Sequence, residues 1–378
     1  LESGHAYRCF CTHERLEALR EEQTLARLNS AYDGRCRELD RTRAETRAAA
    51  GESFVVRFRV PAGRTAIEDL VRGDVSFDNA EVDDWIMLRQ DATPTYNFCV
   101  VVDDIAMQIT HVLRGEEHLV NTPKQVLLYT AFGAAPPVFG HLPLLLGKDK
   151  KKLSKRSGDT ALDDYRRKGY PREAIANFLS LQGWALDGTH EIFSIDDLVR
   201  KFDIRDVNKA GAIFDPEKFL WMSGEYIRMD SVARIAERAA PFVVEAGLCT
   251  AHELERRWDW FCTLVSQEKE RIRIYSELPH RIAHYFASDD AVSYDPEAEA
   301  LVRKRPDRQG VLAAYHEWLR GRNDLLDPPA LAAATKSWLA EKGWKVPALF
   351  QPLRCALTGL AGGPDIFETM RLLGTVSV

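Results

Sequence analysis

Hydrophobic and polar residues alternate along Phe54–Val60, near the start of the chain. This period of two is typical of a β-strand with one buried face, and Trp85–Arg89 is predicted to be a second short strand. Before them, Glu14–Arg27 is a strongly charged segment that is expected to form a helix. Residues 1–97 are therefore predicted to form an α/β module.

Strand-like and helix-like segments alternate along residues 98–147. The expected helix, Pro123–Phe132, has proline in its first turn and is followed by Gly133, as is common at the two ends of helices. Alternating strands and helices are typical of a parallel sheet, so these residues are predicted to form the second half of a doubly wound nucleotide fold. The expected strands are Phe98–Val102, Ile109–Leu113 and Val138–Leu146.

Helical patterns dominate the rest of the chain, beginning with Asp159–Lys168 and then Pro171–Leu181, which Gly183 closes. After about Met229 only helices are predicted. The expected fold class is α/β plus all-α: a partial Rossmann-like domain with an inserted α/β module, followed by helical domains. The expected domains are residues 1–97, 98–147, 148–229 and 230–378.

The loop after the third expected strand carries the sequence Lys152-Leu153-Ser154-Lys155-Arg156. Lysine is a mobile point charge, which suits a loop that closes over a triphosphate while charge shifts between its oxygens. Taken alone, five such residues are more often a solvated run of charge. Their position between an apolar strand and a helix favours the phosphate loop, because α/β folds bind nucleotides there.

This loop resembles the Lys-Met-Ser-Lys-Ser signature of class I aminoacyl-tRNA synthetases, in the Lys-Leu-Ser-Lys-Arg form typical of glutamyl-tRNA synthetases. Further stretches are similar to that family in order and spacing, so the resemblance covers nearly the whole chain. They are Pro-Thr-Tyr-Asn-Phe at 94–98, Val-Val-Asp-Asp at 101–104, Thr-His-Val-Leu-Arg-Gly-Glu-Glu-His at 110–118, Thr-Pro at 122–123, Leu-Arg-Cys-Ala-Leu-Thr-Gly at 353–359 and Gly-Pro at 363–364.

The resemblance implies that Tyr96, Val100 and Arg114 bind the amino-acid substrate. The planar guanidinium of Arg114 can hold a carboxylate through two hydrogen bonds, which suits an acidic substrate. Two structural alternatives are open: Tyr96 as the cap of a strand edge, and Arg114 as an ion-pair partner of Glu116 or Asp104.

The same resemblance implies a glutamate–tRNA ligase, which joins glutamate to ATP as glutamyl adenylate and then transfers it to tRNA(Glu). Lys152 and Lys155 are then the catalytic lysines, and Mg²⁺ is expected with ATP. The expected ATP-binding residues are Glu117, Leu145, Ser154, Lys155 and Arg156.

A zinc site is also implied, because Cys9, Cys11 and Cys36 resemble the Cys-x-Cys-x24-Cys-x-His site of some bacterial family members. Glu38 stands where that site has histidine, and a carboxylate is a less usual fourth ligand of structural zinc. An empty remnant with half-buried thiols is an equal alternative. Other candidates for the fourth ligand are His5 and His13.

The net charge of −6 conceals two basic clusters. Residues 148–172 contain ten Lys or Arg against four Asp, and a second cluster lies in the helical part. Phosphates respond to local potential within about 8 Å, so two patches suit an elongated polyanion such as tRNA. The second cluster consists of Arg303, Lys304, Arg305, Arg308, Arg320 and Arg322.

No stretch approaches the roughly 18 apolar residues of a membrane span, and no signal segment opens the chain. The seven cysteines lie scattered without a secretory context, which favours reduced thiols. A cytoplasmic protein is therefore expected, and the resemblance to the family implies a monomer.

Synthetases of this family begin with a nucleotide-binding half that carries a His-Ile-Gly-His-like motif, which is not found here. The chain is therefore expected to be a fragment that is inactive on its own, and a non-catalytic tRNA-binding fragment is one alternative function. A glutamyl-queuosine tRNA(Asp) synthetase-like enzyme is another, although it lacks a helical anticodon domain. Glutaminyl-tRNA synthetases have β-barrels in their C-terminal part, where this chain predicts helices. The choice between tRNA(Glu) alone and tRNA(Glu) with tRNA(Gln) is open.

Overall fold

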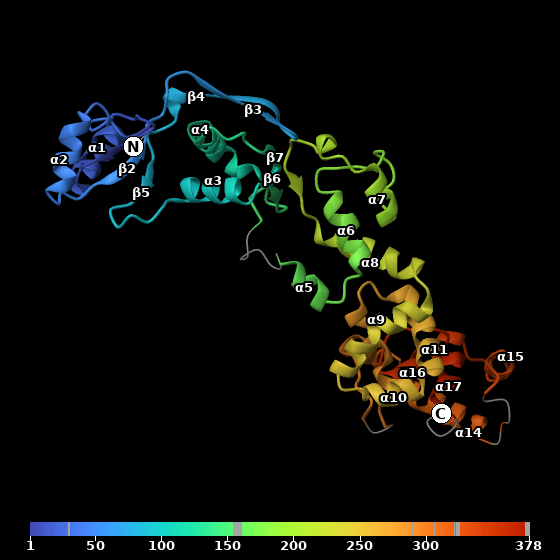
Figure 1. The fold of residues 1–378 in the computed structure, drawn as a ribbon. Coiled ribbons are helices and arrows are strands. Elements are labelled where there is room, and N and C mark those ends of the chain that lie inside the picture. Colours follow the sequence, from blue (N-terminus) through green and yellow to red (C-terminus); the bar gives the residue numbers. More distant parts are fainter. Residues whose placement is uncertain are drawn as a thin grey trace. The chain divides into compact units, whose positions relative to one another are not determined.

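The computed structural model of the protein describes residues 1–28, 31–153, 161–288, 291–305, 307–320, 322 and 326–374 (Figure 1). The chain divides into two compact units. None of the helices in these described residues has both the length and the apolar character that a bilayer span requires. The first unit comprises residues 1–152, 180–191 and 197–214, and the second comprises residues 153–179, 192–196 and 215–378.

A small antiparallel sheet opens the first unit, with the strand order β1-β2-β5. The side chain of Thr12 caps the first helix by accepting from the backbone N–H of Arg15, and Asp40 caps the second in the same way. The rings of Phe58 and Trp85 are stacked with their centroids 4.6 Å apart. Both residues belong to the hydrophobic core next to this sheet. The elements are β1 (Ala6–Cys9), α1 (His13–Leu25), α2 (Arg41–Ala49), β2 (Val55–Phe58) and β5 (Ile86–Leu88).

A second sheet of four strands has the order β4-β3-β7-β6. Strands β3 (Arg64–Asp69) and β4 (Gly73–Asp78) form an antiparallel hairpin, which the sequence did not predict. Strand β7 (Val138–Leu142) runs parallel to both β3 and β6 (His111–Gly115). In the β6–β7 register, each residue of one strand lies beside a residue of the other.

The apolar segment Phe98–Val102 is helical, so the prediction of a strand there was wrong. It lies inside α3 (Tyr96–Ala106), where Val101 is fully buried and its neighbour Val102 is exposed. Its β-branched residues favour a strand locally, but packing of this helix against α4 (Thr122–Phe132) decides the outcome. The prediction of α4 is confirmed, and Gly133 ends it with φ of +67°.

The expected strand Val138–Leu146 is two strands, because the chain breaks after β7. Strand β8 (Leu145–Leu146) pairs in parallel with β9 (Ala212–Ile213) in a separate two-stranded sheet. The first unit also contains most of helix α7 (Ile195–Lys201) and the short 3₁₀ helices Asn79–Glu81, Glu116–Asn121 and Ile204–Asp206.

Helices build the second unit, as the sequence predicts for the residues after Met229. One core gathers around Phe261, Leu264 and Ile282, and a second around Tyr315, Trp338 and Leu349. The domain limits at residues 97, 147 and 229 stay predictions. The helices of this unit are α5 (Leu162–Arg167), α6 (Arg172–Ser180), α8 (Pro216–Met229), α9 (Val232–Glu245), α10 (Ala251–Arg256), α11 (Trp258–Glu268), α12 (Leu278–Ile282), α13 (Pro296–Arg303), α14 (Arg308–Leu319), α15 (Pro328–Glu341), α16 (Val346–Thr358) and α17 (Ile366–Leu373).

Candidate functional site

Side chains of β7 and α4 hold the guanidinium of Arg114, which lies on β6. Its Nε donates to Nε2 of His141 at 3.2 Å. Its Nη2 donates to Oγ1 of Thr122 at 3.0 Å and to Oε1 of Gln125 at 2.8 Å. Burial lowers the pKa of Arg114, and Tyr96 opposes this shift. Because the pKa of an arginine starts far above neutral, the group keeps its charge.

The alternative ion pairs of Arg114 are not formed among the described residues. Glu116 pairs with Arg72, and Asp104 accepts a hydrogen bond from the hydroxyl of Tyr129 at 3.4 Å. The guanidinium is therefore fixed by neutral acceptors, and its positive charge has no direct acidic partner. A partly buried charge of this kind suits an anionic ligand.

Tyr96 and Val100 lie one turn apart on α3, and so they share a face of that helix. Tyr96 is the first residue of the helix and does not cap a strand. Its ring centroid lies 6.4 Å from that of His118, and its hydroxyl acts electrostatically on Arg114. Tyr96 is half exposed, whereas Val100 packs against the core below the sheets. The structure thus brings Tyr96 and Arg114 together.

Glu117 and Lys152 form an ion pair at 2.6 Å, between Oε1 of the glutamate and Nζ of the lysine. The hydrogen bond from Lys152 lowers the pKa of Glu117. Both side chains are exposed, at 36% for Glu117 and 59% for Lys152, so the pair contributes roughly 1 kcal/mol or less. Lys152 can therefore exchange this partner for another anion at little cost.

The backbone of Leu145 belongs to β8, which pairs with Ala212 of β9. Lys152 forms a β-bridge with Leu146, so the start of the lysine loop lies beside the strand that carries Leu145. Ser154, Lys155 and Arg156 lie outside the described residues.

The three predicted zinc ligands lie close together beside the three-stranded sheet of the first unit, where Cys9 is the last residue of β1. The Sγ atoms of Cys9, Cys11 and Cys36 all lie within 4.8 Å of one another. The hydroxyl of Tyr32 accepts from the backbone N–H of Cys36 at 2.8 Å, and it lies 3.4 Å and 3.6 Å from the Sγ atoms of Cys9 and Cys11. The three sulfurs therefore lie close together, with the hydroxyl of Tyr32 beside two of them.

None of the three residues that the sequence suggested as a fourth ligand belongs to this cysteine group in the described part of the chain. Glu38 is exposed and pairs with Arg59 at 3.3 Å. His5 contacts Ser3, and His13 pairs with Glu17. The hydroxyl of Tyr32 lies nearer to the cysteine sulfurs than these side chains do, through the contacts given above.

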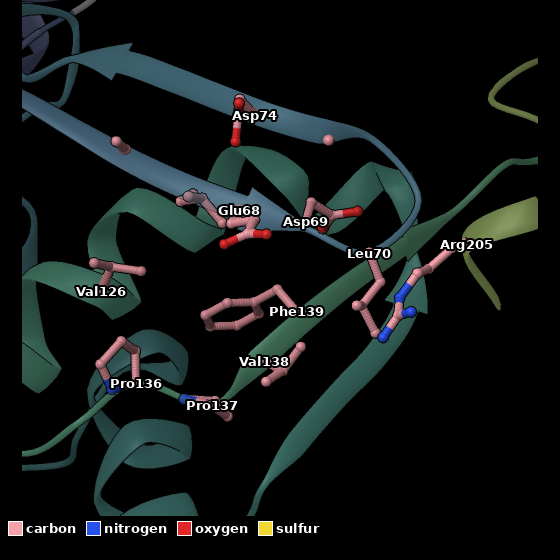
Figure 2. Close-up of a pocket in the computed structure, with 13 residues that line it drawn as sticks. Glu68, Asp69, Leu70, Asp74, Val126, Pro136, Pro137, Val138, Phe139 and Arg205 are labelled. Carbon is pink, nitrogen blue, oxygen red and sulfur yellow. The ribbon is translucent and has the colours of Figure 1, made fainter. Parts of the chain in front are cut away.

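A cavity of about 720 Å³ lies beneath the β3–β4 hairpin, but none of the predicted site residues lines it. Figure 2 shows Glu68 and Asp74 from the hairpin, Phe139 from β7 and Arg205 around this space. Asp69 lines this cavity and is hydrogen-bonded to His141. The cavity is therefore adjacent to the His141 side chain, which accepts a hydrogen bond from Arg114.

Comparisons with known proteins decide the family. A family described as tRNA synthetases class I (E and Q), catalytic domain, matches residues 1–221, and the anticodon binding domain matches residues 234–378. The glutamate–tRNA ligase of Alkaliphilus metalliredigens is 40% identical over 375 residues, which cover 99% of this chain and 76% of that protein. That of Symbiobacterium thermophilum is 41% identical over 382 residues, with 99% and 77% covered. The chain belongs to the glutamate–tRNA ligase family.

A solved glutamate–tRNA ligase has the same fold. The enzyme from Elizabethkingia meningosepticum, determined in complex with its amino acid, superposes with a TM-score of 0.81 at 28% sequence identity. The match covers 98% of this chain and 77% of the chain of that enzyme. The expected fold class is thereby confirmed, as is the helical anticodon-binding part that a glutamyl-queuosine synthetase lacks. Glutamate–tRNA ligases use ATP.

The sequence did not predict the residues that hydrogen-bond to the predicted site residues and fix their positions. Asp69 and His141 are 72 positions apart, and neither belongs to a stretch that marks the family here. Tyr32 stands four residues before Cys36, and this spacing was the available signal for it. Gln125 lies on α4, three residues after Thr122, on the helix face that meets Arg114.

Proposed function

We propose that the protein activates glutamate with ATP to glutamyl adenylate and transfers the glutamyl group to the terminal ribose of tRNA(Glu). The observation that carries this proposal is Arg114, a fixed and partly buried cation whose charge meets no acidic side chain directly. Tyr96 lies beside it and offers a hydroxyl. A guanidinium and a phenol placed together recognise a carboxylate by charge and by hydrogen bonding.

The nucleotide would lie at the other part of the site, where β8 meets the start of the lysine loop. Leu145 would contact adenine through its backbone, and Glu117 would contact ATP after Lys152 leaves it. Lys152 and Lys155 would stabilise the charge that develops on the α-phosphate, with Ser154 and Arg156 binding the same triphosphate. Mg²⁺ would accompany the phosphates.

The tRNA would follow the helical part of the chain, since residues 234–378 match an anticodon-binding domain. Arg303, Arg305 and Arg308 would contribute phosphate contacts there. We further propose a monomer in the cytoplasm.

We infer that Cys9, Cys11, Cys36 and Tyr32 hold Zn²⁺. Three thiols and a phenol supply four ligands around one point, although a tyrosine oxygen is a less usual partner than a fourth sulfur or an imidazole. The ion would be structural, and it would tie β1 to the segment before α2. Metal analysis should find zinc with the purified chain and lose it in Cys36→Ser. Cys99→Ser changes an exposed thiol and is the control.

The proposed reaction is tested by glutamate-dependent exchange between ATP and labelled pyrophosphate, with tRNA present, in a protein that also carries the family's nucleotide-binding half. Arg114→Leu should raise the KM for glutamate and leave the KM for ATP near that of the wild type, because the guanidinium is assigned to the amino acid alone. Arg64→Leu, which changes an exposed arginine of β3, is the control. An unchanged KM for glutamate in Arg114→Leu would remove the proposed carboxylate site.

Charging of purified tRNAs distinguishes the related activities. A glutamate–tRNA ligase charges tRNA(Glu), and a glutamyl-queuosine enzyme would modify tRNA(Asp) instead. Glutamylation of tRNA(Asp) alone would contradict the proposal.

A further inference from the structure

His141 lies directly beside Arg114 in the parallel register of β6 and β7. Its side chain is fully buried, and so is that of Asp69. Nδ1 of His141 lies 2.6 Å from Oδ2 of Asp69, and Nε2 accepts from Nε of Arg114 at 3.2 Å. The imidazole therefore links a buried carboxylate to the predicted substrate-binding arginine.

Hydrogen bonds fix the tautomer of His141. Oδ1 of Asp69 accepts from the backbone N–H groups of His141, Val71 and Arg72 at 3.1, 3.0 and 2.9 Å. Burial would raise the pKa of Asp69, but these bonds and the bond from His141 lower it below its usual value. The carboxylate is thus an acceptor, and Nδ1 must carry the proton. Nε2 is then the bare nitrogen, as the N–H of Arg114 requires.

The remaining bonds of Arg114 hold the guanidinium from its other side. Nη2 donates to Thr122 and Gln125, and the amide of Gln125 in turn donates to Oδ1 of Asn97 at 3.1 Å. Within the described part of the chain, these bonds use Nε and Nη2 and leave Nη1 free of them. The planar group can therefore present Nη1 in only one orientation.

We propose that His141, held as the neutral Nδ1–H tautomer by Asp69, is a positioning residue that orients Arg114 so that Nη1 meets a carboxylate of the substrate. The inference rests on the proposed function, because the ligand of Nη1 is taken to be glutamate. The imidazole itself contacts no substrate. Its role is to prevent the guanidinium from rotating toward other acceptors, which lowers the conformational cost of binding.

Two substitutions separate positioning from packing. His141→Leu removes the acceptor, so it should raise the KM for glutamate roughly 10- to 100-fold, as expected when a buried charged donor loses its partner. His141→Gln keeps an acceptor oxygen near the position of Nε2, so it should restore most of the affinity. Neither variant should change the KM for ATP more than about threefold. His111→Gln, an exposed histidine of β6, is the control.

Asp69→Asn tests the tautomer itself. The new amide would donate toward Nδ1, which would move the imidazole proton to Nε2 and place two donors against each other at Arg114. We expect a KM for glutamate close to that of His141→Leu. Wild-type glutamate KM in both Asp69→Asn and His141→Leu would overturn the proposal.

Nitrogen-15 NMR of the imidazole gives a readout without substrate. The wild type should show the Nδ1–H tautomer and a slowly exchanging Nε–H of Arg114, and Asp69→Asn should show the Nε2–H tautomer. An Nε2–H tautomer in the wild type would overturn the proposal even if the reaction is confirmed. If instead the wild type shows Nδ1–H but Arg114→Leu leaves glutamate binding unchanged, the proposed function fails at Arg114 and the inferred carboxylate contact fails with it.

Discussion

The two cationic parts of the proposed site differ in how firmly they are held. Arg114 is partly buried and donates to three side chains, one of which is itself anchored by a buried carboxylate. Lys152 is exposed and has one exposed acid as its partner. A rigid cation suits a carboxylate that must be recognised in one orientation. A loosely held cation suits phosphates, whose charge moves during the reaction.

The largest expected effect is on the KM for glutamate when the rigidly held cation, Arg114, is changed. Arg114→Lys keeps the charge but loses Nε and the planar fork, so the contact to His141 and the contact to a carboxylate cannot both form. The KM for glutamate should rise roughly 100-fold in pyrophosphate exchange. Arg64→Lys, at an exposed position of β3, should leave it unchanged. A rise of less than threefold in Arg114→Lys would mean that charge alone is recognised there.

The second effect is on the rate of adenylate formation when the loosely held cation, Lys152, is changed. Lys152→Met should slow adenylate formation roughly 10-fold or more while the KM for glutamate stays near that of the wild type, because this lysine is assigned to the phosphates. Single-turnover kinetics measure both. Lys151→Met changes the neighbouring exposed lysine and is the matched control. Equal losses in the two variants would indicate a general loss of positive charge.

Stability in acid should separate the two carboxyl groups that serve these cations. The pKa is lowered in the folded protein for both Asp69 and Glu117. A lowered pKa stabilises the fold above the unfolded value, about 4, and this stability is lost as the pH falls through the folded pKa. Because Asp69 is buried and Glu117 is exposed, Asp69→Asn should reduce the free energy of unfolding at pH 7 by roughly 1–3 kcal/mol. Glu117→Gln should reduce it by about 1 kcal/mol or less.

Denaturation by urea at pH 7 and below pH 4 measures this difference. The gap between wild type and Asp69→Asn should narrow in acid, where the carboxyl becomes protonated. A gap of the same size at both pH values would show that Asp69 does not act through its charge.

Salt gives the smallest expected effect. Raising NaCl from 0.1 M to 0.5 M screens exposed charges more than partly buried ones. The KM for ATP should rise a few-fold, and the KM for glutamate should change less than twofold. The opposite order would reverse the assignment of the two cations.

The family motifs identified the predicted site residues in the sequence. They did not predict the side chains that contact these residues and fix their positions. Arg114 and Tyr96 lie in family stretches and come together in the structure, on β6 and α3. His141 and Asp69 come to Arg114 only through the pairing of three strands, which no local pattern encodes. Tyr32 differs from them, because it contacts the cysteines from a segment without regular structure and stands only four residues before Cys36.

The wrong prediction for α3 has a local cause. Phe98–Val102 is rich in β-branched residues, and a short apolar run does not distinguish a strand from a buried helix. The helix is favoured by its packing on α4, a contact between segments that are about 25 residues apart. By contrast, α4 carried its own signals in Pro123 and Gly133, and its prediction is confirmed.

We propose that Arg114, in the orientation set by His141, recognises a carboxylate of glutamate. A structure of the protein with glutamate bound tests it most directly. We expect a carboxylate oxygen within hydrogen-bond distance of Nη1 of Arg114, with the bond between Nε and His141 intact and the hydroxyl of Tyr96 close by. Glutamate bound away from Arg114, or bound with the guanidinium turned away from His141, would contradict it.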